Sequence, residues 1–183
     1  MAEKNMGKYE IYKSMHKNLT KAMRNGFYYE AIFIEYAILE DRFAAVLKYA
    51  GLKCVDDKGR DFAITKKIGM IENRQCFDNK FVRDRLSLKL LGDARNWLKE
   101  RNELIHHLAT MPYDSEHVRK IAEDGNELVR IISNKSRSVI NRLKKEAKMK
   151  IRTDFVTNSS SSSFFIVSIK NTKNSRCYQI PYQ

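Results

Sequence analysis

The sequence predicts an all-α protein, an up-and-down bundle of four to five helices followed by a flexible C-terminal tail. Three observations favour this fold class. Apolar residues recur at spacings of three and four over most of the chain, which is the period of an amphipathic helix. Only two prolines, Pro112 and Pro181, occur among 183 residues. A hydrophobic content of 43% is sufficient for a core between the helices.

Three helices are expected in the first half of the chain. The first covers residues 7–24. The second, 27–50, has the most regular apolar stripe and ends before Gly51, a residue type that is common just after a helix. This stripe lies on one helix face and consists of Ile32, Tyr36, Leu39, Phe43, Val46 and Ala50. A loop at 55–61 then leads to a short helix at 62–73.

A long helix is expected over residues 84–109, after an irregular segment at 74–83. Pro112 ends this helix, because the residue before a proline avoids helical backbone angles. Its apolar stripe consists of Leu91, Ala94, Leu98, Ile105 and Leu108. Arg101 occupies the place in this stripe where the spacing would otherwise put an apolar side chain.

The last helix is expected to start at a capping residue, Asp114 or Ser115. The polar sequence Asn-Lys-Ser at 134–136 is a candidate break in it. Its stripe consists of Val118, Ile121, Gly125, Leu128, Ile132, Val139 and Leu143. Together the helices form the first predicted domain, residues 1–148.

Residues 149–183 form the second predicted domain, a Ser-rich linker and tail. Five consecutive serines make a flexible spacer of low sequence complexity. The segments FFIVSI and CYQIPY, either side of NTKNS, can pair as a small β-hairpin. A lone two-stranded hairpin is marginally stable in water, so the tail is expected to be mobile unless another segment pairs with it.

The net charge of +13 favours a polyanionic partner, with nucleic acid the first candidate and an anionic membrane surface the second. More than half of the excess charge lies in residues 134–152, which contain eight Lys or Arg and one Glu. The alternative explanation for this segment is a helix face that contacts only solvent.

Membrane insertion and metal chemistry are not expected. No window approaches 18 continuous apolar residues and the N-terminal residues lack the apolar run of a signal peptide, so a cytoplasmic location is predicted. Cys54, Cys76 and Cys177 form no metal-binding pattern and are expected to be buried or free thiols. The side chains of the adjacent His106 and His107 diverge by about 100° on a helix, so they are not expected to bind one metal ion. P-loop and dinucleotide-binding motifs are absent from the sequence, so no cofactor is expected.

The segment RNELIHH contains the candidate catalytic residues Arg101, Asn102 and His106. Asn102 and His106 are four residues apart and share a helix face, and the long Arg101 side chain can lean toward that face. Cleavage of RNA without a metal needs a base for the ribose 2′-OH proton and a cation for the charge on phosphorus. Histidine titrates near neutral pH, and arginine offers a fork of donors to phosphate oxygens. The alternative is structural: Arg101 pairs with Glu35 or Glu40 inside the core.

This segment resembles the signature of HEPN domains, in which Arg is followed by four to six residues and then His, often with Asn directly after the Arg. The upstream sequence NGFYYEAIFIEYAILEDRFAAVL, residues 25–47, looks like the long early helix of such domains, with an acidic residue near its middle. The resemblance covers roughly residues 8–148. It implies an all-α and usually dimeric protein, in which two motifs meet across a two-fold interface and form one composite site.

Many HEPN proteins are metal-independent endoribonucleases of toxin–antitoxin, abortive-infection or CRISPR systems. By this resemblance His106 is the general base or acid, Arg101 holds the scissile phosphate and Asn102 orients it. The implied partners are RNA, a second copy of the chain, and an antitoxin or regulatory protein. Leu108 stands where some HEPN toxins carry a modifiable Tyr, which argues against that mode of control. His107 is an alternative acid–base residue.

Other HEPN domains have lost catalysis, so a non-catalytic nucleic-acid-binding or adaptor module is the competing interpretation. A third interpretation is a partner-binding protein regulated through its tail. The tail segment MKIRTDFVTNSSSSSF, which starts at Met149, is similar to the opening residues of many short uncharacterised bacterial proteins. No chemistry follows from this second resemblance.

Overall fold

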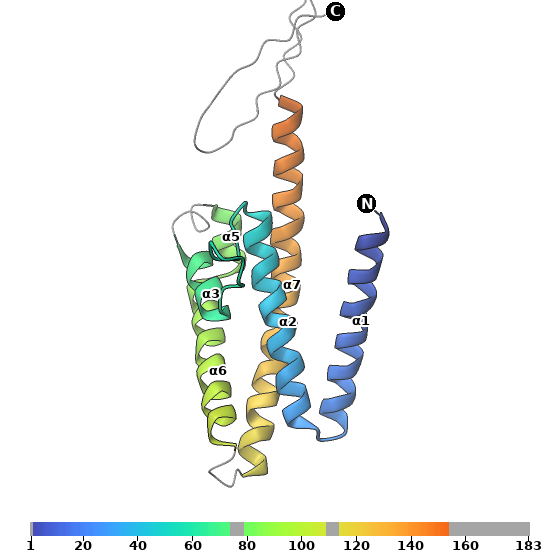
Figure 1. Cartoon of the computed structure of the whole chain (residues 1–183), viewed down its shortest axis with the longest axis vertical. Helices are drawn as coiled ribbons and strands as arrows, with labels where there is room; N and C mark the ends of the chain where they lie inside the picture. Colours follow the sequence, from blue (N-terminus) through green and yellow to red (C-terminus); the bar gives the residue numbers. More distant parts are fainter. Residues whose placement is uncertain (1, 74–78, 109–113, 154–183) are drawn as a thin grey trace, which may run out of the picture. The chain divides into compact units, whose positions relative to one another are not determined.

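A computed structural model describes residues 2–73, 79–108 and 114–153, which fold into helices joined by loops (Figure 1). The six helices of this part of the chain are α1 (Ala2–Arg24), α2 (Tyr28–Tyr49), α3 (Ile64–Glu72), α5 (Lys80–Arg85), α6 (Leu88–His107) and α7 (Ser115–Thr153). The all-α fold class is therefore confirmed for the described residues. The chain forms two structural units, Met1–Ile140 and Asn141–Gln183.

Helices α1 and α2 form an antiparallel pair joined by a tight turn (Figure 1). Gly26 lies in this turn with φ 73°, a left-handed conformation that glycine adopts without steric cost. The Asp41 carboxylate on α2 accepts hydrogen bonds from Lys8 Nζ, at 2.8 Å, and from the Tyr12 hydroxyl on α1. Arg42 donates from Nε to the same hydroxyl at 2.7 Å and lies over the Tyr12 ring. These contacts hold α1 against the C-terminal half of α2.

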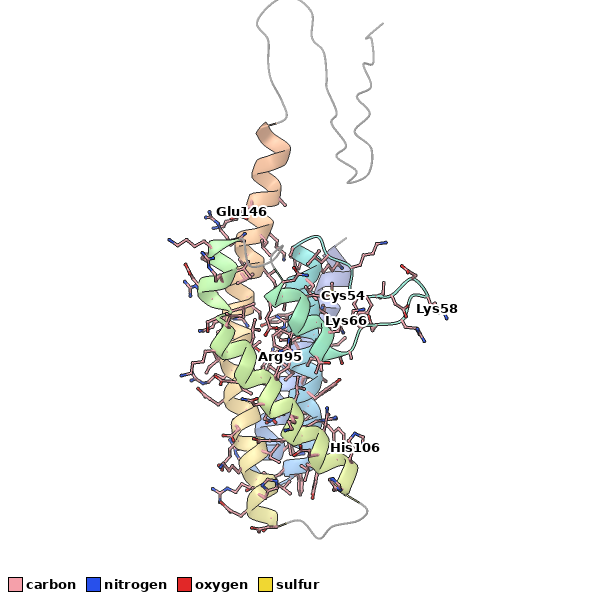
Figure 2. All side chains as sticks on the ribbon, turned by 90° about the vertical axis from the view of Figure 1, so that its left-hand side faces the viewer. Cys54, Lys58, Lys66, Arg95, His106 and Glu146 are labelled. Atoms are coloured by element: carbon pink, nitrogen blue, oxygen red, sulfur yellow. The ribbon has the colours of Figure 1, made fainter. Side chains whose placement is uncertain are left out.

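Helix α3 packs against α2 and α6. Lys67 on α3 is buried, and its ammonium group pairs with the Glu40 carboxylate of α2 at 3.0 Å. Arg95, near the middle of α6, pairs with Glu72 in the last turn of α3 (Figure 2). The loop between α2 and α3 projects away from the helices and carries Lys58 at its tip (Figure 2). Ion pairs thus connect α3 to both of its neighbours.

Helices α6 and α7 are joined through Trp97, whose indole Nε1 donates to the Ile121 carbonyl at 2.9 Å. One turn later in α7, Gly125 leaves room for Trp97 and for Glu35 of α2. A Cβ atom at Gly125 would lie 2.2 Å from Glu35 Oε2 and 2.7 Å from Trp97 Nε1. Helices α2, α6 and α7 therefore meet around this glycine. The largest fully buried side chains are Phe43, Ile32, Ile38, Leu39, Leu47, Ile68, Ile71, Leu86, Leu91, Leu98, Leu104 and Ile121.

The predicted single helix over 84–109 is wrong at its start. The helix α5 already begins at Lys80, inside the segment that was expected to be irregular. The backbone then leaves helical geometry at Leu86 and Ser87 before α6 begins. Ser87 Oγ accepts from the Leu90 backbone N–H at 3.3 Å, so this serine caps a new helix instead of continuing the old one.

The candidate break at 134–136 is also wrong, because α7 continues without interruption from Ser115 to Thr153. Ser136 is buried, and its hydroxyl donates to the Ser133 carbonyl at 3.2 Å. A serine that bonds the backbone of its own helix needs no partner elsewhere, which allows it to lie on the buried face.

The N-terminal cap of α7 is Asp114, one of the two predicted residues, since its Oδ1 accepts from the Glu116 backbone N–H at 3.1 Å. The predicted domain boundary after residue 148 falls within α7. The expected serine spacer and β-hairpin, together with Cys76 and Cys177, lie outside the described residues.

Cys54 is a free thiol, and its Sγ lies 3.5 Å from the Ala44 carbonyl oxygen. Within residues 2–73, 79–108 and 114–153, no helix combines the length and the apolar character that a bilayer crossing requires.

Candidate functional site

Arg101 lies on the face of α6 that turns toward α2. Its guanidinium carbon is 4.5 Å from the centroid of the Tyr36 ring and 5.6 Å from that of Phe33, both on α2. A guanidinium over aromatic faces is attracted by the electron-rich π-system, and its planar shape packs against the ring. The apolar stripe of α6 therefore accommodates an arginine by placing it against aromatic side chains at the edge of the core.

The polar contacts of Arg101 are few. Its Nη1 donates to Asn102 Oδ1 at 3.0 Å, while its Nε is buried and has no hydrogen-bond partner in the described structure. The expected alternative, an ion pair with Glu35 or Glu40, is not found. Glu40 pairs with Lys67 instead, and both oxygens of Glu35 lack a hydrogen-bond partner among the described residues. Arg101 is therefore a cation without a carboxylate partner in this part of the chain.

Asn102 and His106 are both exposed on α6, one turn apart. His106 lies in the last turn of the helix, at the end remote from α3 (Figure 2). Within the described residues its imidazole has no hydrogen-bond partner. The structure thus brings Arg101 and Asn102 into direct contact and leaves His106 open to solvent. The described structure shows no contact between the His106 imidazole and the Arg101 guanidinium.

His107, the alternative acid–base residue, is exposed as well and follows His106 in the same last turn of α6. The neighbouring Leu108 is 43% exposed, although it was expected on the buried stripe. Ile105 is half-buried. The end of α6 therefore presents an apolar edge beside its histidines.

The sequence analysis missed the aromatic residues that hold Arg101. Tyr36 was placed on the apolar stripe of α2, and Phe33 lies one residue beyond the stripe position Ile32. An aromatic residue outside the stripe of a regular helix is the signal that could have identified Phe33. Burial and the Glu40 carboxylate raise the pKa of Tyr36 above its ordinary value, against the opposing charges of Arg101 and Lys67. The phenol next to Arg101 therefore stays neutral at physiological pH.

A separate groove of about 270 Å³ lies between α6 and α7. It is lined by Asp93, Asn96, Trp97, Glu100, Asp124, Glu127 and Leu128. Its four carboxylates repel phosphate, so this groove is unsuited to RNA. Among the described residues, no group of three or more His, Cys, Asp or Glu side chains is arranged to hold a metal ion.

Comparisons with protein-family models, with curated proteins and with solved structures find no match to this chain.

Proposed function

We propose that this protein is a metal-independent endoribonuclease of the HEPN type, acting in the cytoplasm as a toxin or defence component. The observation that carries the proposal is the state of Arg101. Its guanidinium is held by Tyr36, Phe33 and Asn102 and lacks a carboxylate partner in the described structure. An arginine positioned in this way is ready to bind an anion, and a phosphate diester supplies one.

In the proposed reaction, Arg101 binds the scissile phosphate and stabilises the negative charge that develops on its oxygens. Asn102 orients the guanidinium through the 3.0 Å hydrogen bond. His106 takes the proton from the ribose 2′-OH, whose oxygen then attacks the adjacent phosphorus and expels the 5′-oxygen of the next nucleotide. The products are a 2′,3′-cyclic phosphate and a 5′-hydroxyl.

Two copies of the chain are needed for this site. The described structure shows no contact between His106 and the Arg101 guanidinium within one copy, and the exposed Leu108 near the end of α6 offers an apolar contact surface. A two-fold axis near the end of α6 would place the His106 of one copy beside the Arg101 of the other. A regulatory partner such as an antitoxin remains a prediction of the HEPN resemblance.

The proposal predicts that His106→Ala lowers the rate of RNA cleavage by about 10²–10⁴-fold, the usual contribution of a general base. His107→Ala is the matched control, because it removes the neighbouring exposed imidazole and should leave the rate within a few-fold of the native protein. Single-turnover cleavage of a labelled single-stranded RNA measures both rates. If His107→Ala is the inactive variant, the assigned base is wrong.

A second candidate function is nucleic-acid binding without catalysis, favoured by the basic character of α7. In the described part of this helix, Arg137, Arg142, Lys144 and Lys145 are exposed. This function gives RNA binding that weakens steeply with salt, with no cleavage at any protein concentration.

A further inference from the structure

Phe33 is an aromatic residue in an unusual position, because 49% of it is exposed beside a half-buried arginine. Its neighbour on the same surface, Tyr36, is more buried and lies closer to the Arg101 guanidinium. Tyr36 therefore supports Arg101 from the core side, and Phe33 extends the aromatic surface outward from it. The exposed part of Phe33 is not needed to hold the bundle together.

A nucleotide matches this pair of groups. Its phosphate offers an anion, which the described part of the chain does not supply to Arg101, and its base offers a flat aromatic face for Phe33. Stacking on aromatic side chains is the common way in which proteins hold unpaired bases, and it requires no particular base because every base has such a face. A base within a duplex is already stacked on both sides and is closed to this contact.

We propose that Phe33 is a base-stacking residue that holds one unpaired nucleotide of the RNA next to the phosphate bound by Arg101. The proposal rests on the proposed function for the role of Arg101. Phe33 is a positioning residue in this account, since it contacts the substrate base and not the reacting atoms.

A second copy of the chain is the alternative partner for the exposed face of Phe33. The positive charges of the protein favour RNA over a second copy. An identical copy brings the same net charge of +13 and a second Arg101, which has no carboxylate partner among the described residues. The proposed two-fold contact brings a second His106 beside Arg101 and leaves room for the substrate. Packing the second copy over Phe33 as well would bury a guanidinium whose Nε lacks a partner among the described residues, which is costly without a compensating anion. A nucleotide neutralises the guanidinium and covers the ring at the same time.

The test measures RNA binding by the full chain in a His106→Ala background, which prevents cleavage during the measurement. The probes are a fluorescent single-stranded RNA and a hairpin RNA of the same composition. Phe33→Leu removes the flat ring and keeps an apolar side chain, and Phe33→Trp keeps the stacking surface. The matched control is Tyr9→Leu, since Tyr9 is an exposed aromatic residue on α1, 65% of it in contact with solvent. The residue before it, Lys8, contacts Asp41, which lies two helical turns after Phe33 on α2. Tyr9 is therefore outside the proposed stacking surface.

We expect Phe33→Leu to weaken binding of the single strand about tenfold, the usual loss for one stacked base. Phe33→Trp and Tyr9→Leu should stay within about twofold of the parent, and binding of the hairpin stem should not change. Native affinity in Phe33→Leu, or an equal loss for both RNAs, would overturn the proposal. So would a shift from dimer to monomer in sedimentation of Phe33→Leu, because Phe33 would then contact a second copy.

The outcome is separable from that of the proposed function. If the native protein never cleaves RNA but Phe33→Leu still loses affinity for the single strand, base stacking stands and the ribonuclease assignment fails. If the native protein cleaves and Phe33→Leu binds normally, the ribonuclease assignment stands and base stacking fails.

Discussion

Glu35 is the residue with the strongest electrostatic perturbation in the described structure. Its side chain is fully buried between α2, α6 and α7, and neither carboxylate oxygen has a hydrogen-bond partner among the described residues. Burial raises the pKa of Glu35 from 4.5 to about 9, because an ionised carboxylate loses its hydration there. Glu35 is therefore a neutral acid at physiological pH and is no counter-ion for Arg101.

This perturbation makes stability depend on pH. In the unfolded chain Glu35 ionises near its ordinary pKa of 4.5, while the folded protein keeps the proton up to about pH 9. Folding therefore takes up a proton between these values. The contribution of Glu35 to stability is fully present below pH 4.5 and is lost as the pH rises toward 9, by at most about 1.4 kcal/mol per pH unit.

Glu35→Gln removes this titration, and we predict that its stability relative to the native protein increases as the pH rises from 5 to 9, by a few kcal/mol in total. The measurement is the free energy of unfolding in urea at several pH values. Glu30→Gln changes an exposed position on the same helix, and its free energy of unfolding should depend on pH as that of the native protein does. If the free energy of unfolding depends on pH in the same way for Glu35→Gln and the native protein, Glu35 is ionised in the folded state.

At the scale of the helices, Gly125 sets how closely α7 approaches α2 and α6. A Cβ atom there would overlap the Glu35 carboxyl and the Trp97 indole, at 2.2 and 2.7 Å. The sequence analysis placed Gly125 correctly on the buried stripe of α7, and it is buried in the structure. Its role as a contact point could not be predicted, since that depends on which residues of α2 and α6 face it.

We predict that Gly125→Ala destabilises the protein by about 1–2 kcal/mol. Overpacking costs about 1–3 kcal/mol, and the better helix propensity of alanine recovers up to about 1 kcal/mol. Gly92→Ala is the matched control on α6, because a Cβ atom there meets nothing within 4 Å. This control should be stabilised by about 0.5–1 kcal/mol, as measured by thermal unfolding. A stabilised Gly125→Ala variant would mean that the helices do not meet at this glycine.

The sequence predicted the long helices well, because each carries a regular apolar stripe. The predicted helix boundaries were wrong where a side chain forms a hydrogen bond with the nearby backbone. Ser87 caps α6 and thereby separates it from α5, and Ser136 bonds within α7 and lets the helix continue. Both are serines, a residue type that can either end a helix or remain inside it, and the pattern of apolar residues does not distinguish these outcomes.

The candidate site was predicted only in part. Arg101, Asn102 and His106 were found together because they are close in sequence on one helix. The surroundings of Arg101 came from another helix, and the register between α2 and α6 decides whether Glu35, Glu40 or the aromatic rings face it. That register results from packing of the whole core, so it cannot be predicted from the apolar stripe of one helix. The roles of the three site residues remain a proposal.

At the scale of the whole molecule, Arg101 faces α2 and His106 is exposed, so the proposed chemistry calls for a second copy of the chain. The net charge of +13 favours a polyanionic partner. In the proposed function its phosphate binds the Arg101 guanidinium, which has no carboxylate partner among the described residues. A protein that sediments as a monomer in the presence of RNA would be incompatible with the composite site.

The most direct test of this account is the chemistry of the RNA ends produced in EDTA. The native protein should cut single-stranded RNA into fragments that carry 2′,3′-cyclic phosphate and 5′-hydroxyl ends, and His106→Ala should produce them about 10²–10⁴-fold more slowly. Intact RNA at every protein concentration, fragments with 5′-phosphate ends, or unchanged cutting by His106→Ala would each contradict the proposed attack by the 2′-OH with His106 as its base.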